Sequence, residues 1–189
     1  QHITKEFDNK EEFELNWVEA SAHPIGAVGL WNSMIKIIKM AKEKGDDIIV
    51  ICEDDHYFTE NYSPKLLFKE VTEAYIQGAE VLSGGIGGFG QAIPAGYHRY
   101  KVDWFWCTQF IVIYNRFFDK MLDYSFQNTD TADGVISKLA TNIMVIYPFI
   151  SEQKDFGYSD VTQSNMEQQG KIREHFARAN KHMKSISLK

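Results

Sequence analysis

Apolar residues along this chain alternate between two spacings. Residues 27–44 repeat apolar side chains at helical spacing, with lysines on the remaining positions. The apolar stripe consists of Val28, Trp31, Met34, Ile35 and Ile38. Gly45 then ends the predicted helix as a C-cap residue, and residues 48–52 form a continuously apolar, β-branched run. Such a run indicates a strand that is buried on both faces, as in a parallel sheet.

The alternation of helical and strand-like segments continues to about residue 147. Helices are predicted for residues 64–77, 116–122 and 131–141, strands for residues 17–20, 79–82, 110–114 and 143–147, and a glycine-rich loop for residues 84–101. Strands alternating with helices favour an α/β fold, and we expect a three-layer sandwich with a mostly parallel central sheet. No linker or internal repeat divides the sequence, so residues 1–189 are predicted to form a single domain.

Composition agrees with a globular protein. The 189 residues are 44% hydrophobic and 24% charged, which excludes a disordered chain. No apolar stretch reaches the length of a membrane-spanning helix. The two cysteines, Cys52 and Cys107, lie in apolar runs and are predicted to be buried free thiols, which fits a reducing, cytoplasmic location.

The net charge of −6 is unevenly distributed. Residues 171–189 carry a net charge of +5, so the rest of the chain carries −11. An acidic body argues against nucleic acid as a partner. The basic tail is predicted to be a helix, with Ile172, Phe176 and Met183 on one side. Two interpretations stay open: a terminal helix docked on the core with a solvated basic face, or a contact with an anionic ligand or the inner membrane surface.

An acidic cluster, Glu53-Asp54-Asp55, directly follows the predicted strand 48–52. Adjacent carboxylates repel one another, so a bound cation would stabilise them. Ligands of open α/β sheets bind at the carboxyl ends of strands. Glu53 and Asp55 project to the same side of an extended chain, and two carboxylates suit Mg²⁺ or Mn²⁺. A plain solvated turn is the alternative.

This arrangement of a strand followed by Glu53-Asp54-Asp55 resembles the Asp-x-Asp-type motif of GT-A-fold glycosyltransferases. The segment from Gly26 through Ser33 to the acidic cluster is similar to glycosyltransferase family 25, which makes lipopolysaccharide and related glycans. Later matches are looser and comprise residues 108–114, 120–122, Asp130, Asp133 and residues 148–160. The family's usual Ser-His pair is replaced by Asn32-Ser33, and a first strand is expected before Gln1.

The resemblance implies a metal-dependent, inverting transfer of a sugar, most readily from a UDP-sugar, to a glycan or lipid-linked acceptor. It implies that Glu53 lies toward the ribose, that Asp54 borders the nucleotide, and that Asp55, with Glu53, holds Mn²⁺ or Mg²⁺. Direct inversion needs a carboxylate that takes the proton of the acceptor hydroxyl. Asp133 and Asp130, at the start of the predicted helix 131–141, are the candidates, although acids there are often helix caps.

The segment after residue 82 adds further candidates. Its G-x-G-x-x-G pattern is no dinucleotide fingerprint, because Pro94 prevents a helix from following. We interpret it as a mobile loop ordered by ligand, or as a plain surface loop. The aromatic residues of 97–106 would stack on sugars or fill the core. Arg99 or Lys154 would clamp phosphate, and His56 is a metal ligand, a hydrogen-bonding residue or an exposed turn residue.

Two other function classes remain open from the sequence. One is another Mg²⁺-dependent enzyme of nucleotide or phosphate chemistry that uses the same acidic edge. The other is a catalytically silent relative that binds carbohydrate through the aromatic segment. Release of phosphate without an acceptor would indicate the first of these classes. Glycan binding that a chelator does not affect, without hydrolysis of a donor, would indicate the second.

Overall fold

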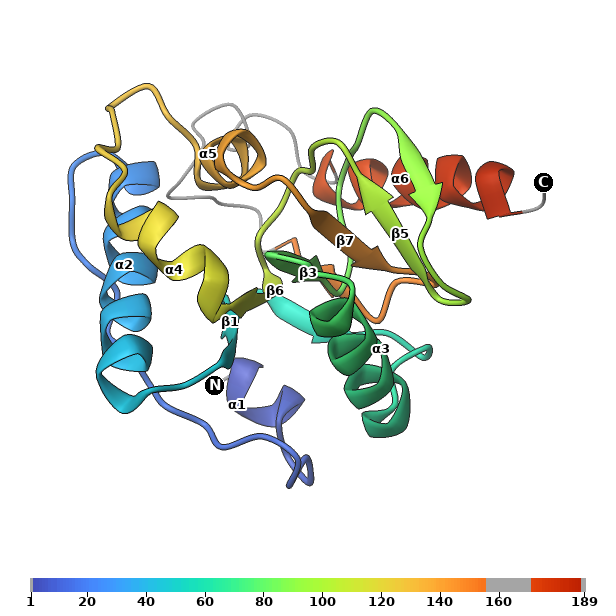
Figure 1. Cartoon of the computed structure of the whole chain (residues 1–189), viewed down its shortest axis with the longest axis horizontal. Helices are drawn as coiled ribbons and strands as arrows, with labels where there is room; N and C mark the ends of the chain where they lie inside the picture. The colour runs from blue at the N-terminus through green and yellow to red at the C-terminus, as the bar shows by residue number, and fades with distance from the viewer. Residues whose placement is uncertain (1, 156–170, 188–189) are drawn as a thin grey trace.

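A computed structural model describes residues 2–155 and 171–187. Within these residues, a six-stranded sheet has the order β1-β6-β3-β7-β5-β4 (Figure 1). Its strands are β1 (Ile48–Cys52), β3 (Val81–Ser83), β4 (Ala92–Pro94), β5 (Arg99–Val102), β6 (Phe110–Tyr114) and β7 (Ile143–Ile146). A second, two-stranded sheet pairs β2 (His56–Phe58) with β8 (Ser151–Gln153).

Helices cover both faces of the central sheet. The helices are α1 (His2–Glu6), α2 (Gly26–Lys44), α3 (Pro64–Ile76), α4 (Asn115–Leu122), α5 (Ala132–Leu139) and α6 (Lys171–Ser187). Side chains of α2, α4, α5 and α6 share one apolar cluster with the sheet. Side chains of α1 and α3 share the other. The predicted three-layer α/β sandwich is therefore confirmed.

The prediction of a mostly parallel sheet is wrong, because the sheet is mixed. β3 and β7 are parallel. The other neighbouring pairs, β1–β6, β3–β6, β5–β7 and β4–β5, are antiparallel. β6 and β7 are buried along their whole length, and helices on both sides of an antiparallel pair bury a strand as fully as they do in a parallel sheet. The apolar pattern could not therefore report strand direction. The prediction that residues 48–52 are buried on both faces is wrong, because β1 is an edge strand in which only Ile51 is fully buried and Ile48 is exposed.

Glycine, serine and proline residues in the sequence mark the ends of two helices. Gly45 ends α2 in the left-handed conformation, with φ of 76°. The Ser63 side chain caps α3 by accepting a hydrogen bond from the Leu66 N–H, and Pro64 occupies the first turn. The predicted strand at residues 17–20 is absent, since this segment pairs with no strand of the described chain.

The basic tail docks on the core. Phe176, Ala179 and Met183 of α6 are buried in the larger apolar cluster, whereas Lys181 and Lys184 stay exposed. The first of the two interpretations of this helix is thus confirmed. No helix within the described residues has both the length and the apolar character needed to cross a membrane.

The glycine-rich segment is packed rather than loose. Residues 84–87 and Phe89 are buried, and a Cβ atom at Gly85 would lie 1.9 Å from the Ser151 carbonyl oxygen. The Gly84 N–H donates to the Phe110 carbonyl, and the Ile150 N–H donates to the Gly84 carbonyl. The segment therefore joins β3 to β6 and to the chain before β8, and it ends in the hairpin of β4 and β5 instead of a continuous loop.

Candidate functional site

The acidic cluster forms a turn at the end of β1, which is an edge strand of the sheet. The Glu53 N–H continues the pairing with the neighbouring chain by donating to the Gln109 carbonyl at 3.0 Å. The Glu53 carboxylate accepts a 2.5 Å hydrogen bond from the Thr108 hydroxyl. Asp54 is exposed at the tip of the turn, and Asp55 is half-buried.

The small sheet of β2 and β8 fixes the position of Asp55. The Gln153 side-chain amide donates to Asp55 Oδ2, and the Lys154 N–H donates to the Asp55 carbonyl at 2.7 Å. The other carboxylate oxygen, Oδ1, is buried and has no hydrogen-bond partner. A buried carboxylate oxygen is costly when it is unsatisfied, so Asp55 has unused capacity to bind a cation or a donor group.

Both inner carboxylates resist ionisation. Burial, together with the negative charge of Asp55, raises the pKa of Glu53 to about 8. Burial also raises the pKa of Asp55 to about 6, although the hydrogen bond from Gln153 acts in the opposite direction. A divalent cation between the two groups would remove both the repulsion and the cost of burying charge.

A cleft of about 1570 Å³ opens beside this turn. Its walls come from α2, β1, the segment before α2, the start of α5 and the start of α6. The acidic or basic residues on the wall near the turn are Glu53, Asp54, Asp55, Asp133, Lys154, Asp155 and Lys171. Clefts with converging polar groups are the usual location of ligand sites.

Asp133 reaches the cleft from the first turn of α5. Thr131 caps this helix through its side chain, and Asp133 Oδ2 accepts a 3.2 Å hydrogen bond from the Cys107 N–H. Cys107 adopts a positive φ of 78°, an uncommon conformation for a non-glycine residue. Asp133 is hydrogen-bonded to Cys107 and Glu53 to the adjacent Thr108, and both carboxylates line the cleft, so they belong to one site.

The carboxylates suit a cation that keeps part of its coordination for other ligands. Across residues 2–155 and 171–187, no three His, Cys, Asp or Glu side chains are grouped so that they would hold a metal ion by themselves. Mg²⁺ is commonly held through one or two carboxylates, with waters and substrate phosphates completing its shell. The oxygen donors of Glu53 and Asp55, and the unpartnered Oδ1 of Asp55 in particular, fit that pattern.

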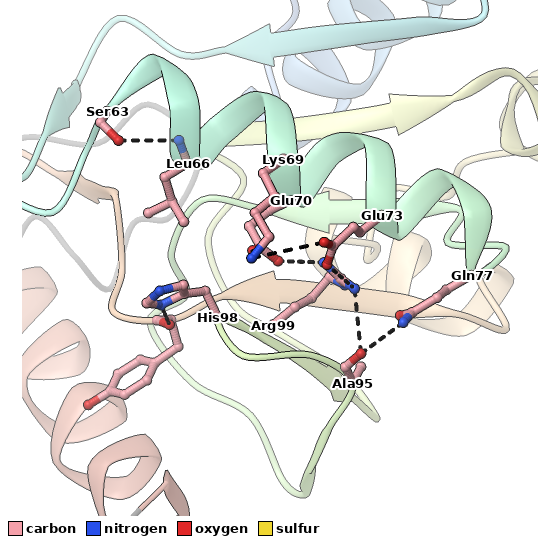
Figure 2. A network of polar contacts seen from close by, with 10 residues as sticks. Ser63, Leu66, Lys69, Glu70, Glu73, Gln77, Ala95, His98 and Arg99 are labelled. Atoms are coloured by element: carbon pink, nitrogen blue, oxygen red, sulfur yellow. Dashed lines mark hydrogen bonds and ion pairs between the residues drawn. The ribbon is translucent and has the colours of Figure 1, made fainter.

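Arg99 is not at the cleft, contrary to the prediction that it clamps phosphate. Its side chain is fully buried and points from β5 to α3 (Figure 2). Its guanidinium pairs with Glu70, which is also fully buried, and with Glu73 at 3.3 Å. Both partners lie on one face of α3, so the cation is occupied inside the protein and is unavailable to a ligand.

Two further candidate residues, Asp130 and His56, do not face the cleft. Asp130 Oδ2 accepts hydrogen bonds from the Tyr124 hydroxyl at 3.1 Å and the Gln127 N–H at 2.8 Å, and Asp130 does not line the cleft. His56 is buried, with Nδ1 2.8 Å from the Ser151 hydroxyl. It is therefore the hydrogen-bonding residue of the three interpretations, and burial lowers its pKa to about 3.

Sequence reasoning did not single out two residues that line the cleft, Thr108 and His175. Thr108 donates a hydrogen bond to the Glu53 carboxylate, and His175 lines the cleft from α6. Both lie far along the chain from the acidic cluster. Thr108 falls in the loosely matching segment 108–114 but was assigned no role there, and His175 belongs to no motif. Lys154 does line the cleft, as expected, and its side chain is exposed.

We predict that Glu53→Gln raises the melting temperature of the metal-free protein at pH 8.5 and not at pH 5. A carboxyl with a raised pKa gives its full stability below the unfolded pKa and loses it as pH rises through the folded pKa of about 8. Glutamine cannot ionise and still accepts from Thr108. Thermal unfolding in EDTA across pH 5–9 measures the effect, at roughly 2–4 °C per kcal/mol.

A second series of thermal unfolding measurements, with Mn²⁺ in place of EDTA, tests whether the same carboxylates bind a cation. Cations compete with protons for these oxygens, so Mn²⁺ should stabilise the wild type more at pH 8.5 than at pH 5, and should have little effect on the variant. A Mn²⁺ shift that is equal in both proteins, or a variant that melts lower than wild type at pH 8.5 without metal, contradicts the prediction.

No protein-family model and no curated protein matches the sequence. Among solved structures, the chain is similar to apo UDP-glucose pyrophosphorylase, with a TM-score of 0.46 and 10% identity over 82% of this chain and 61% of that chain. It is also similar to UDP-glucose pyrophosphorylase complexed with UDP-glucose, with a TM-score of 0.46 and 9% identity over 85% of this chain and 64% of that chain. The chain thus spans less than two thirds of these structures. The likeness is one of α/β arrangement and does not identify the reaction or ligand of this chain.

Proposed function

We propose that this chain is a metal-dependent glycosyltransferase that moves a sugar from a nucleotide-sugar donor to a glycan or lipid-linked acceptor. One observation carries the proposal. The Glu53–Asp55 turn lies at the carboxyl end of β1, on the wall of a large cleft, and the buried Oδ1 of Asp55 has no protein partner. The site combines oxygen donors for a cation with a further carboxylate, Asp133, from another element.

In this proposal Glu53 and Asp55 would hold Mg²⁺ or Mn²⁺, which neutralises the charge that develops on a diphosphate leaving group. Asp54 and Lys154 border the same cleft and are exposed. Asp54 would face the nucleotide, and Lys154 would contact a phosphate oxygen as a flexible point charge. Gln153 keeps Asp55 in position by its side-chain hydrogen bond.

Asp133 takes the role of base, because Asp130 is turned away from the cleft. Its Oδ2 would accept the proton of the acceptor hydroxyl as the hydroxyl oxygen attacks the anomeric carbon. The bond from that carbon to the diphosphate breaks in the same step, and the electron pair leaves with the diphosphate. Attack opposite the leaving group inverts the anomeric centre.

We expect UDP to stabilise the protein against thermal unfolding only when Mn²⁺ or Mg²⁺ is present. Ligand at 100 times its Kd adds about 2.7 kcal/mol, which is easily measured as a shift in Tm. Asp55→Ala should remove the shift. Glu60→Ala, which changes an exposed acid outside the cleft, should keep it.

The result can contradict the proposal in two ways. If no nucleoside diphosphate stabilises the protein in the presence of Mn²⁺, the glycosyltransferase proposal is contradicted. Stabilisation that is unchanged by EDTA and by Asp55→Ala shows that the acidic turn does not bind the nucleotide. Release of phosphate or pyrophosphate from a nucleotide without transfer to any sugar would assign the site to the alternative class of Mg²⁺-dependent enzymes.

A further inference from the structure

A second, smaller cavity lies between the glycine-rich segment and α6. Its volume is about 240 Å³, and its wall contains Gly87, Gly88, Phe89, Trp104, Trp106, Arg178 and Ala179. Trp106 also lines the large cleft, so this one side chain stands between the two cavities. The small cavity therefore adjoins the cleft that contains the proposed site of transfer, and the two meet at Trp106.

The aromatic wall is held rigidly. The backbone N–H of Trp106 donates to the Gly88 carbonyl at 3.1 Å, and the backbone N–H of Gly87 donates to the Trp106 carbonyl at 2.9 Å. The indole packs so closely on Gly88 that a Cβ atom there would lie 2.7 Å from Trp106 Cε3. Trp106 is nevertheless 44% exposed, and its ring centroid lies 5.2 Å from that of Trp104. Two partly exposed indoles thus line the cavity, and that of Trp106 is held in place by Gly87 and Gly88.

Arg178 adds a positive charge to this aromatic wall. Its guanidinium contacts His175 Nδ1 at 2.8 Å, and no acidic side chain within the described residues forms an ion pair with it. Burial and the positive charges of Arg178 and Lys171 lower the pKa of His175. A neutral His175 accepts from the guanidinium without neutralising its charge, so Arg178 can still pair with an anion.

We propose that this cavity binds an anionic sugar residue of the acceptor, one that carries a carboxylate or a phosphate. Indole faces stack on the apolar C–H face of a sugar ring. A guanidinium binds carboxylate or phosphate through two parallel hydrogen bonds. The cavity is smaller than the roughly 300–1,000 Å³ of sites for drug-sized ligands, which suits a single ring. Its identity as an acceptor subsite rests on the proposed function.

The test compares three probes on the full chain: methyl β-D-glucuronide, glucose 6-phosphate and methyl β-D-glucoside. Quenching of tryptophan fluorescence, or calorimetry, measures the affinity of each. We expect at least one anionic sugar to bind about tenfold more tightly than the neutral glycoside, because hydrogen bonds between charged groups are the stronger ones. Arg178→Gln should abolish that preference. Lys184→Gln, an equal change of charge at an exposed position of the same helix, should preserve it.

Failure of this inference and failure of the proposed function are distinguishable. Arg178→Gln should leave the Mn²⁺-dependent stabilisation by UDP unchanged, because Arg178 does not line the large cleft. If UDP binding is intact and both anionic sugars bind no better than the glycoside, or bind equally to wild type and Arg178→Gln, the anionic subsite is overturned. If UDP fails to bind while the Arg178-dependent preference holds, the cavity stands and the glycosyltransferase proposal falls.

Discussion

Asp133→Asn is expected to lower the rate of sugar transfer by about 10²–10⁴-fold while leaving the binding of UDP and Mn²⁺ intact. Asparagine is nearly isosteric with aspartate, and its carbonyl oxygen can still accept the hydrogen bond from the Cys107 N–H that positions the native carboxylate. It cannot take a proton from an acceptor hydroxyl. The variant should therefore retain the site and lose the base.

The measurement is the release of UDP from UDP-hexoses in the presence of methyl glycosides as acceptors. Asp130→Asn is the matched control, since it removes one carboxylate three residues earlier that does not line the cleft. Its rate should stay within a few-fold of wild type. The UDP and Mn²⁺ thermal shift confirms that each variant is folded. Equal loss of rate in the two variants, or an unchanged rate in Asp133→Asn, contradicts the assignment of the base.

These two aspartates show where sequence reasoning stops. Both precede or begin the same predicted helix, and both are acids in a motif that resembles the same family. The structure separates them because the loop before α5 closes on Asp130 through the Tyr124 hydroxyl and the Gln127 N–H. Such a closure depends on the loop's path, which no local pattern encodes.

The elements themselves were more accessible from the sequence. β1 and β6 have the bounds that their apolar runs predict, Ile48–Cys52 and Phe110–Tyr114. The position of the acidic turn at a strand end followed directly from β1. Short strands were missed: β4 and β5 lie in a stretch rich in glycine, proline and aromatic residues, where strand signals are weak. The pairing of β5 with β7 is a long-range property of the fold.

Arg99 was misassigned for a related reason. A lone arginine among aromatic residues matches a phosphate-binding pattern, and its partner Glu70 lies 29 positions earlier in the sequence. Helix α3 brings the two together only when it packs across β5 (Figure 2). The positive charge of Arg99, which the sequence pattern assigned to a ligand, therefore forms an ion pair inside the protein.

That contact predicts the largest loss of stability among these variants. Arg99→Met should lower the free energy of unfolding by about 3–5 kcal/mol, because it removes the buried cation that contacts the fully buried Glu70 most closely. Glu70 Oε1 accepts no hydrogen bond. The other cation paired with it is Lys69, whose half-exposed side chain places Nζ 3.9 Å away, so Lys69 compensates only in part for the loss of Arg99. Equilibrium urea unfolding measures the change, and Glu73→Gln, at the half-exposed end of the network, should cost about 1 kcal/mol or less.

A double variant distinguishes loss of the ion pair from loss of packing. If the cost comes from a stranded buried charge, adding Glu70→Leu to Arg99→Met should restore much of the stability, since apolar replacement of a whole buried pair is often neutral or stabilising. If the loss of stability comes from lost packing, the changes in unfolding free energy caused by the two substitutions should instead add. Full additivity in the urea unfolding free energies, or a single Arg99→Met variant that loses less than about 1 kcal/mol, would show that this pair does not hold α3 against β5.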